Sequence, residues 1–177
     1  RGFKANNDVY VDGIRDPGIS VRETFDTEQV EVLKGPSGSV GGRGATGGTV
    51  NIATKQPQDV DFQKYSLEFT SAGTIRTTAD INVAYDDRLQ LRFNGMRQEG
   101  NVAGRDHVYD NRTGLAGALR YKLTDAITLD ASYSFSEFDQ MPDWGVPYTT
   151  AGPNGARGPV TEFGVDRSTF YGIPERD

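Results

Sequence analysis

A strict alternation of apolar and polar residues over long segments is the feature that most constrains the fold of this chain. From residue 62 to about residue 136, apolar side chains keep to odd-numbered positions through five successive segments. Successive side chains of a β-strand point to opposite faces, so the pattern predicts five antiparallel strands in sequence order. The apolar face includes Leu67, Ile81, Leu91, Leu119 and Leu129. The opposite face includes Arg76, Asp80, Arg92, Arg120 and Asp130.

Such alternation occurs in soluble antiparallel sheets and in transmembrane β-barrels. Three features favour the barrel. The segments run to roughly ten residues, enough to cross a bilayer at a tilt, whereas soluble strands commonly have about five or six. Aromatic residues such as Tyr65, Tyr85 and Tyr133 lie near segment ends, and tight connections alternate with long ones. We therefore expect the odd-numbered apolar side chains to face lipid on the convex side, with the charged residues on the concave side.

Composition excludes several classes of function. The chain has no cysteine and one histidine, His107, so neither a thiolate site nor a histidine-based metal site is expected. The formal net charge of −6 argues against nucleic acid as a partner. No stretch is apolar and long enough for a membrane-spanning helix. The sequence predicts no cofactor, and any iron chemistry would have to be carried by a ligand.

Residues 1–58 follow a different pattern, with short apolar runs between glycine and proline residues. Val9-Tyr10-Val11 precedes Asp12-Gly13, and a similar run precedes Gly35-Pro36, which predicts short strands in a small α/β or β unit. A helical turn is expected near Asp26 to Gln29. Pro57 marks the expected boundary with the long alternating segments. The abrupt first and last residues lead us to expect a piece of a longer protein.

The run from Gly42 to Gly47 matches the spacing of a dinucleotide-binding loop, but no helix pattern follows it, so turns explain these glycines better. The same run belongs to a more specific pattern. Val30-Glu31-Val32-Leu33-Lys34-Gly35-Pro36, followed by the stretch from Gly42 to Pro57, closely resembles the end of the plug domain in TonB-dependent receptors. Arg1-Gly2-Phe3 and the segment from Asp8 to Gly13 resemble two further plug segments of that family.

The resemblance implies a mainly β fold: the C-terminal part of a plug domain over residues 1–58, then the first five strands of a 22-stranded transmembrane β-barrel over residues 59–177. A long extracellular loop is expected from about residue 137. The implied setting is the outer membrane of a Gram-negative bacterium, with outer-membrane lipid around the barrel. The implied activity is transport without catalysis. TonB is the implied partner, through an N-terminal segment that this chain lacks.

The resemblance also assigns roles to individual residues. Arg1 and Arg43 match plug arginines that pair with barrel glutamates and hold the plug, although ordinary solvated side chains remain the alternative. Arg15, Asp16 and Pro17 match the plug apex that faces the ligand, and Phe25 lies near another such loop; simple turn residues are the alternative here. Trp144 and Tyr148 fall in the long loop after the fifth strand, where ligand contact competes with local packing.

A ferric siderophore, more specifically a catecholate, is the expected ligand. The segment from Pro159 to Pro174 resembles the corresponding loop of catecholate receptors. Ferric catecholates are anionic and carry aromatic rings, so guanidinium groups and aromatic faces suit them. The chain offers both kinds of group in its expected ligand-facing segments. They are Arg15, Arg22, Arg157 and Arg167, with Trp144, Tyr148, Phe163 and Tyr171. Uptake of cobalamin or an oligosaccharide, a passive outer-membrane channel, and a soluble adhesin remain the alternatives, whereas haem is disfavoured by the single histidine.

Overall fold

The structure, a computed structural model, describes residues 9–16, 22–35, 48–150, 152, 155 and 157–173. The chain divides into two compact units. The first contains Arg1–Lys64, Ala79–Gly95 and Gly114–Phe135; the second contains Tyr65–Thr78, Met96–Thr113 and Ser136–Asp177. Within the described ranges, nearly all regular structure is β-strand, and η2 (Val160–Phe163) is a single turn of 3₁₀ helix. None of the described segments forms a helix that is long and apolar enough to cross a membrane.

A four-stranded sheet lies in the first unit, in the order β2-β1-β4-β3. Its strands are β1 (Val9–Val11), β2 (Ile14–Arg15), β3 (Thr27–Lys34) and β4 (Gly48–Thr54). β1 and β2 form a hairpin across Asp12 and Gly13, which both have positive φ angles, of 48° and 78°. Such a pair of φ angles is what a two-residue hairpin turn requires. β1 runs parallel to β4, and β3 runs antiparallel to β4.

The helical turn expected near Asp26 to Gln29 is not formed. A turn at Thr24–Asp26 leads directly into β3, whose first residue is Thr27. The reason is the partner strand: Val30 pairs with Ile52 and Val32 with Val50, so β3 gains a ladder of backbone pairing that is irregular only between Thr27 and Gln29. Pairing with β4 overrides the weak local preference for a turn.

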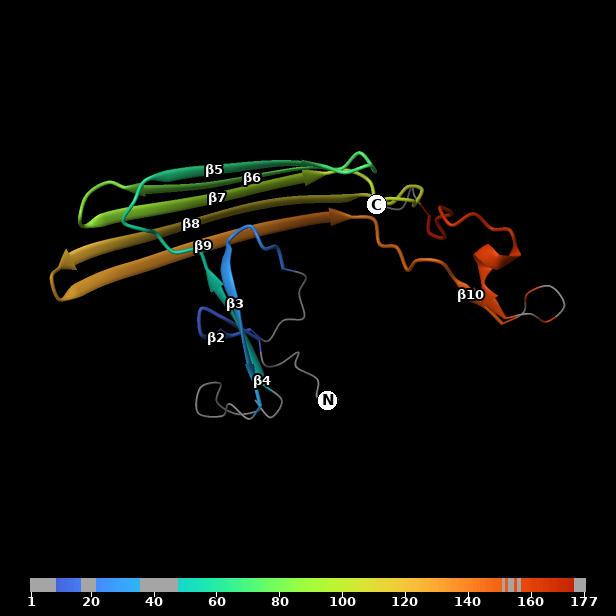
Figure 1. The fold of residues 1–177 in the computed structure, drawn as a ribbon, viewed down its shortest axis with the longest axis horizontal. Helices are drawn as coiled ribbons and strands as arrows, with labels where there is room; N and C mark the ends of the chain where they lie inside the picture. The colour runs from blue at the N-terminus through green and yellow to red at the C-terminus, as the bar shows by residue number, and fades with distance from the viewer. Residues whose placement is uncertain are drawn as a thin grey trace. The chain divides into compact units, whose positions relative to one another are not determined.

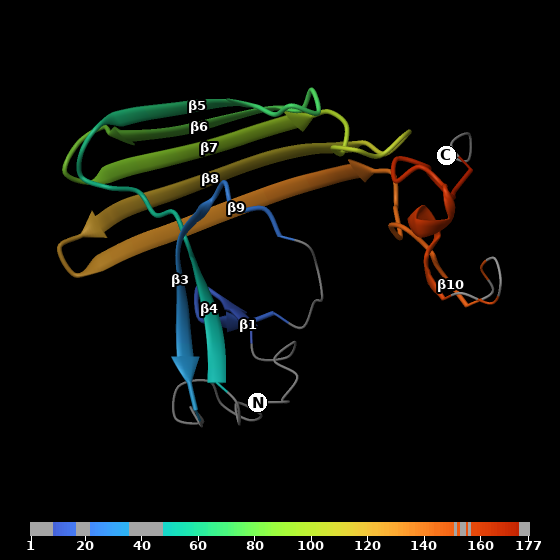
Figure 2. The ribbon, with the colours of Figure 1, turned by 45° about the vertical axis from the view of Figure 1, so that its right-hand side comes forward.

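The long alternating segments form a five-stranded sheet in the order β5-β6-β7-β8-β9, as the sequence predicted. Figures 1 and 2 both show these strands side by side, and the arrowheads of β6 to β9 alternate in direction. The strands are β5 (Phe62–Phe69), β6 (Ile75–Ala84), β7 (Leu89–Glu99), β8 (Asp110–Thr124) and β9 (Ile127–Gln140). Tight turns join β6 to β7 and β8 to β9, whereas residues 100–109 form a longer connection between β7 and β8. In the β6–β7 turn, the amide of Tyr85 donates to the carbonyl of Leu89 at 3.0 Å.

Burial in the first unit is the reverse of that in a soluble sheet. On β6 and β7 the polar side chains are buried, with Asn82 1% and Arg92 2% exposed. The apolar side chains between them are accessible: Phe93 on β7 is 52% exposed, and Leu115 on β8 is 59% exposed. The predicted separation of faces is thereby confirmed for these strands. Because large apolar groups are stable in hydrocarbon, this arrangement suits strands whose outer face meets lipid.

The second unit also contains a short two-stranded sheet. β10 (Tyr148–Thr149) pairs antiparallel with β11 (Gly158–Pro159), and η2 follows directly. These elements belong to the segment after β9 that was expected to be a long loop. That segment therefore has some regular structure of its own.

Candidate functional site

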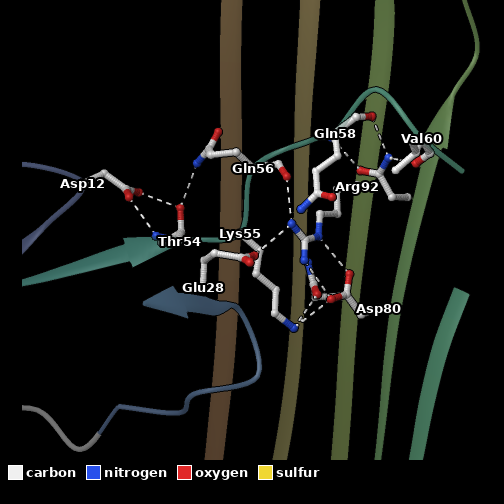
Figure 3. A network of polar contacts seen from close by, with 11 residues as sticks. Asp12, Glu28, Thr54, Lys55, Gln56, Gln58, Val60, Asp80 and Arg92 are labelled. Atoms are coloured by element: carbon white, nitrogen blue, oxygen red, sulfur yellow. Dashed lines mark hydrogen bonds and ion pairs between the residues drawn. The ribbon is translucent and has the colours of Figure 1, made fainter. Parts of the chain in front are cut away.

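Arg92 on β7 is the centre of a buried polar network (Figure 3). Its Nε and Nη2 atoms donate to Oδ1 and Oδ2 of Asp80 on β6, each at 2.9 Å. Alternation places both side chains on the polar face of neighbouring strands, which is why they meet. The planar guanidinium matches the two carboxylate oxygens, so the pair has a fixed geometry.

The other partners of Arg92 and Asp80 come from the segments before β5. Arg92 Nη1 donates to the backbone carbonyl of Gln56 at 2.9 Å and lies 3.0 Å from Oε2 of Glu28. Lys55 Nζ lies 3.0 Å from Oδ2 of Asp80. We call these five residues, Glu28, Lys55, Gln56, Asp80 and Arg92, the Arg92 clamp. Its two positive and two negative side chains balance, which offsets the cost of burying Arg92 and Asp80.

Asn82 on β6 extends the attachment along the chain towards β5. Its Nδ2 donates to the carbonyls of Gln58 at 2.8 Å and Val60 at 2.7 Å, and its Oδ1 accepts from the amide of Gln58 at 3.0 Å. The next hydrogen bond joins the amide of Ala84 to Oδ1 of Asp61 at 2.7 Å. Residues 56–61 are therefore bonded to β6 or β7 at short intervals.

A second chain of hydrogen bonds joins the clamp to the β1–β2 turn. The side chain of Gln56 donates to Oγ1 of Thr54 at 3.0 Å, and that hydroxyl donates to Oδ2 of Asp12 at 2.7 Å. The amide of Thr54 donates to Oδ1 of Asp12 at 2.8 Å. Figure 3 shows this continuous line from Asp12 to Arg92. It holds the end of β4 in a defined position relative to β7.

The turn before β3 makes a different contact, with β8 and β9. Phe25 is buried, with 6% of its surface exposed. A Cβ atom added to Gly114 of β8 would lie 2.5 Å from the Phe25 ring, so the ring packs directly on the glycine backbone. Beside it, Oγ of Ser134 on β9 donates to Oδ2 of Asp26 at 2.7 Å. We call this pair of interactions the β8–β9 contact.

The predicted site residues of the first unit have different surroundings. Arg15 ends β2 and is exposed; Asp16 follows it, forms an ion pair with Arg22, and donates its amide to the carbonyl of Val9 at 2.8 Å. Phe25, expected near a ligand-facing loop, lies instead in the β8–β9 contact. Arg1, Pro17 and Arg43 lie outside the described residues.

Trp144 and Tyr148 belong to the second unit. Trp144 is fully exposed and Tyr148 is largely exposed. Trp144 lines a cavity of about 240 Å³, whereas Tyr148 lies on β10 and is not among the lining residues. Apart from Asp143, the lining is aromatic, proline or glycine: Pro142, Asp143, Trp144, Gly145, Pro147, Phe170, Tyr171 and Gly172. An aromatic ring could stack in such a cavity.

Arg105 organises this part of the second unit. Its Nε and Nη2 atoms donate to the two carboxylate oxygens of Asp143 at 2.6 and 2.8 Å. Its Nη1 donates to the carbonyl of Arg167. The hydrogen bond from Arg105, helped by the amide of Gly145, holds the pKa of Asp143 below its ordinary value. Asp143 is therefore an anion at neutral pH and is neutralised locally by Arg105.

The sequence pattern identified two of the five clamp residues. Asp80 and Arg92 were predicted on the concave face, but their partners Glu28, Lys55 and Gln56 were not identified. Within the described ranges, no group of three or more histidine, cysteine or carboxylate residues is arranged to hold a metal ion. The arrangement is one of attachment, since the charged side chains of the clamp are paired with each other.

Residues 1–49 match the TonB-dependent receptor plug domain. The chain is also similar along its whole length to a probable TonB-dependent receptor, BfrD of Bordetella pertussis, with 35% identity over 100% of this chain. The chain belongs to the TonB-dependent receptor family. It spans about a quarter of the length of the curated relatives it matches, 24% of BfrD and 23% of the Escherichia coli protein Fiu.

Solved structures of TonB-dependent receptors agree with this assignment. The open form of the ferric-catecholate import receptor Fiu from Escherichia coli superposes with a TM-score of 0.82 and 35% identity, over 97% of this chain and 27% of Fiu. The siderophore receptor PiuA from Acinetobacter baumannii gives a TM-score of 0.77 and 30% identity, over 84% of this chain and 21% of PiuA. These relatives are outer-membrane transport receptors of Gram-negative bacteria. The predicted mainly β fold and outer-membrane localisation are confirmed.

Proposed function

We propose that the protein containing this chain imports a ferric siderophore, of the catecholate type, across the outer membrane. The observation that carries the proposal is the fastening of a small sheet, through the Arg92 clamp, to the polar face of strands whose apolar face is exposed. A barrel with such an attached plug requires energy input before a ligand can pass. We therefore include TonB in the proposal as the partner that supplies this energy. The proposal includes no catalytic activity.

The ligand class is supported by the relatives and by the second unit. Fiu is named a catecholate siderophore receptor and shares 37% identity with this chain. The cavity beside Trp144 offers aromatic faces, and Arg157 and Arg167 lie in the same segment of the chain. Aromatic stacking and guanidinium pairing suit an anionic ferric catecholate, with iron held by the ligand. The clamp favours a plugged receptor over the alternative of a passive channel.

Several residue roles form part of this proposal. Arg15, Asp16 and Pro17 would contact the ligand from the plug apex, and Trp144 and Tyr148 from the outer loop. The burial of Phe25 against Gly114 favours a packing role for Phe25 over ligand contact. Arg1 and Arg43 would pair with glutamates of later barrel strands. The plug would end near residue 58, where the connection to β5 begins.

Growth on single iron sources tests the function. A strain without its own catecholate receptors would be complemented with the full-length protein and supplied, under iron limitation, with one ferric complex at a time. We expect growth on ferric catecholates that requires functional TonB. Growth on cobalamin or on an oligosaccharide as the transported nutrient, with no response to any catecholate, would identify the alternative ligand class and overturn the siderophore assignment.

A further inference from the structure

Residues 56–60 make the most regular set of contacts between the plug side and the strands. Every second backbone carbonyl of this segment accepts a hydrogen bond. The carbonyls of Gln56, Gln58 and Val60 all accept from side chains of β6 or β7. The donors, Arg92 and Asn82, are almost completely buried. These bonds are made to the backbone, so they depend on where the segment lies and not on its side chains.

The backbone contacts of the preceding residues are made with the four-stranded sheet, although the side chain of Lys55 reaches Asp80 and Asn94. The amide of Lys55 donates to the carbonyl of Asp26, at 2.8 Å, in the turn before β3. Thr54 bonds to Asp12, and β4 pairs with β1 and β3. Up to Lys55 the backbone therefore belongs to the four-stranded sheet, and from Gln56 it belongs to β6 and β7.

Arg92 contacts both groups with unequal strength. Towards the strands it makes the two-bonded pair with Asp80, and it also holds the carbonyl of Gln56. Towards the four-stranded sheet it has one ion pair, with Glu28, whose side chain is 47% exposed. A partly exposed ion pair is weak because water competes with it and salt screens it. The Glu28 link is therefore the easier one to break.

We propose that residues 56–60 are a fixed part of the barrel, held by Arg92 and Asn82, and that the part of the plug able to move or unfold ends at Lys55. Arg92 is a positioning residue in this scheme. The moving part would separate by breaking the Glu28 and Lys55 ion pairs, the Lys55–Asn94 and Thr54–Gln56 hydrogen bonds and the β8–β9 contact. The segment leading into β5 would stay attached. The idea builds on the proposed function only in requiring a plug that moves; it does not depend on which ligand is carried.

Native-state hydrogen exchange on the full-length receptor in lipid nanodiscs tests this. The measurement is repeated at increasing urea concentrations, all below those that unfold the barrel. The amide of Gln58 is the probe, because it donates to Asn82. We expect Gln58 to exchange together with amides of β7 and more slowly than the amide of Val50 on β4. Such groups of amides identify the parts of a protein that open together. Exchange of the Gln58 amide with the same urea dependence as the Val50 amide would overturn the proposal. The same holds if the amides of Gln58, Val50 and β7 all become exchangeable together.

Two variants assign the effect to Arg92. Arg92→Met should accelerate Gln58 exchange on the order of tenfold or more, since it removes the donor to Gln56 and leaves Asp80 short of a partner. Arg120→Met is the matched control, because Arg120 pairs with Asp130 on an exposed part of the same face; it should change Gln58 exchange by less than about twofold.

Glu28→Gln gives an answer even where Arg92→Met fails to assemble. It weakens one link to the moving part and leaves the hydrogen bonds of residues 56–60 in place, so Gln58 exchange should stay within about twofold of the unmodified receptor, while exchange in β3 speeds up. Acceleration of Gln58 and β3 to the same extent by Glu28→Gln would mean that residues 56–60 open with the plug. None of these measurements uses a ligand, so loss of the siderophore assignment would leave the result intact.

Discussion

The polar faces of two neighbouring strand pairs differ in how they hold the plug. On β6 and β7 the face carries large polar and charged side chains that are buried, including Asp80, Asn82 and Arg92. On β8 and β9 the corresponding positions carry small residues: Gly114, Ala116, Ala118, Ser132 and Ser134. The first face makes the Arg92 clamp, and the second makes the β8–β9 contact. Both follow the same alternation, so side-chain size and charge, rather than the strand pattern, determine which contacts each face makes.

The small residues of β8 have a steric explanation. The Phe25 ring lies so close to the backbone of Gly114 that even one methyl group would overlap it. A large side chain there would push the turn before β3 away from the strands. Glycine at this position lets the ring approach the backbone closely, but it has no side chain that could form a hydrogen bond. The β8–β9 contact therefore depends mainly on packing.

The largest expected effect comes from breaking the clamp from the strand side. Asp80→Asn removes the carboxylate that faces both Arg92 and Lys55, leaving the buried Arg92 with Glu28 as its remaining carboxylate partner. We expect the plug to lose about 3–5 kcal/mol of stability, the usual cost of leaving a buried charge unpaired. Pulse proteolysis of the full-length receptor across a urea series would measure it. Asp130→Asn, which breaks an exposed pair, should cost less than about 1 kcal/mol; equal losses would remove the distinction between the two faces.

A steric change tests the β8–β9 contact. Gly114→Ala should destabilise the plug by about 1–3 kcal/mol, since the new methyl group overlaps the Phe25 ring and the turn must shift. Phe25→Leu in the same protein should recover part of the loss. Gly117→Ala serves as the control because its Cβ would lie 3.8 Å from Phe93, an ordinary contact distance. A Gly114→Ala variant as stable as the unmodified receptor would show that packing there is loose.

Removing the hydroxyl of Ser134 tests the polar part of the same contact. Ser134→Ala deletes one hydrogen bond to Asp26, and we expect a loss of about 0.5–1.5 kcal/mol. The measurement is the same urea series, with Ser132→Ala on the same face of β9 as the comparison. A loss as large as that of Asp80→Asn would mean that the β8–β9 contact holds the plug as firmly as the clamp does.

Salt should produce the smallest difference. Raising ionic strength from about 0.1 to about 1 M shortens the Debye length from about 10 to about 3 Å, which weakens exposed pairs more than buried ones. A double-mutant cycle on Arg120 and Asp130 should therefore lose most of its small coupling energy. The cycle on Arg92 and Asp80 should change by only a few tenths of a kcal/mol. Similar sensitivity of the two cycles would indicate that water reaches the clamp.

The sequence was sufficient for the strands and their faces, because alternation with a period of two needs only local information. It placed Asp80 and Arg92 on the same face for that reason. It could not show that Glu28, 64 residues before Arg92, would complete the clamp, since the position of β3 depends on pairing with β4. Phe25 shows the same limit: a phenylalanine beside a turn has no local feature that distinguishes an exposed loop from a place against a distant glycine.

Arg105 in the second unit closes a stretch of the chain at its base. One guanidinium holds Asp143 and the carbonyl of Arg167, so the two ends of the intervening stretch are fixed close together. The entropic cost of closing a loop rises only slowly with its length. The stretch between Asp143 and Arg167 is thus a place where the chain can change length at little cost in the free energy of closing the loop.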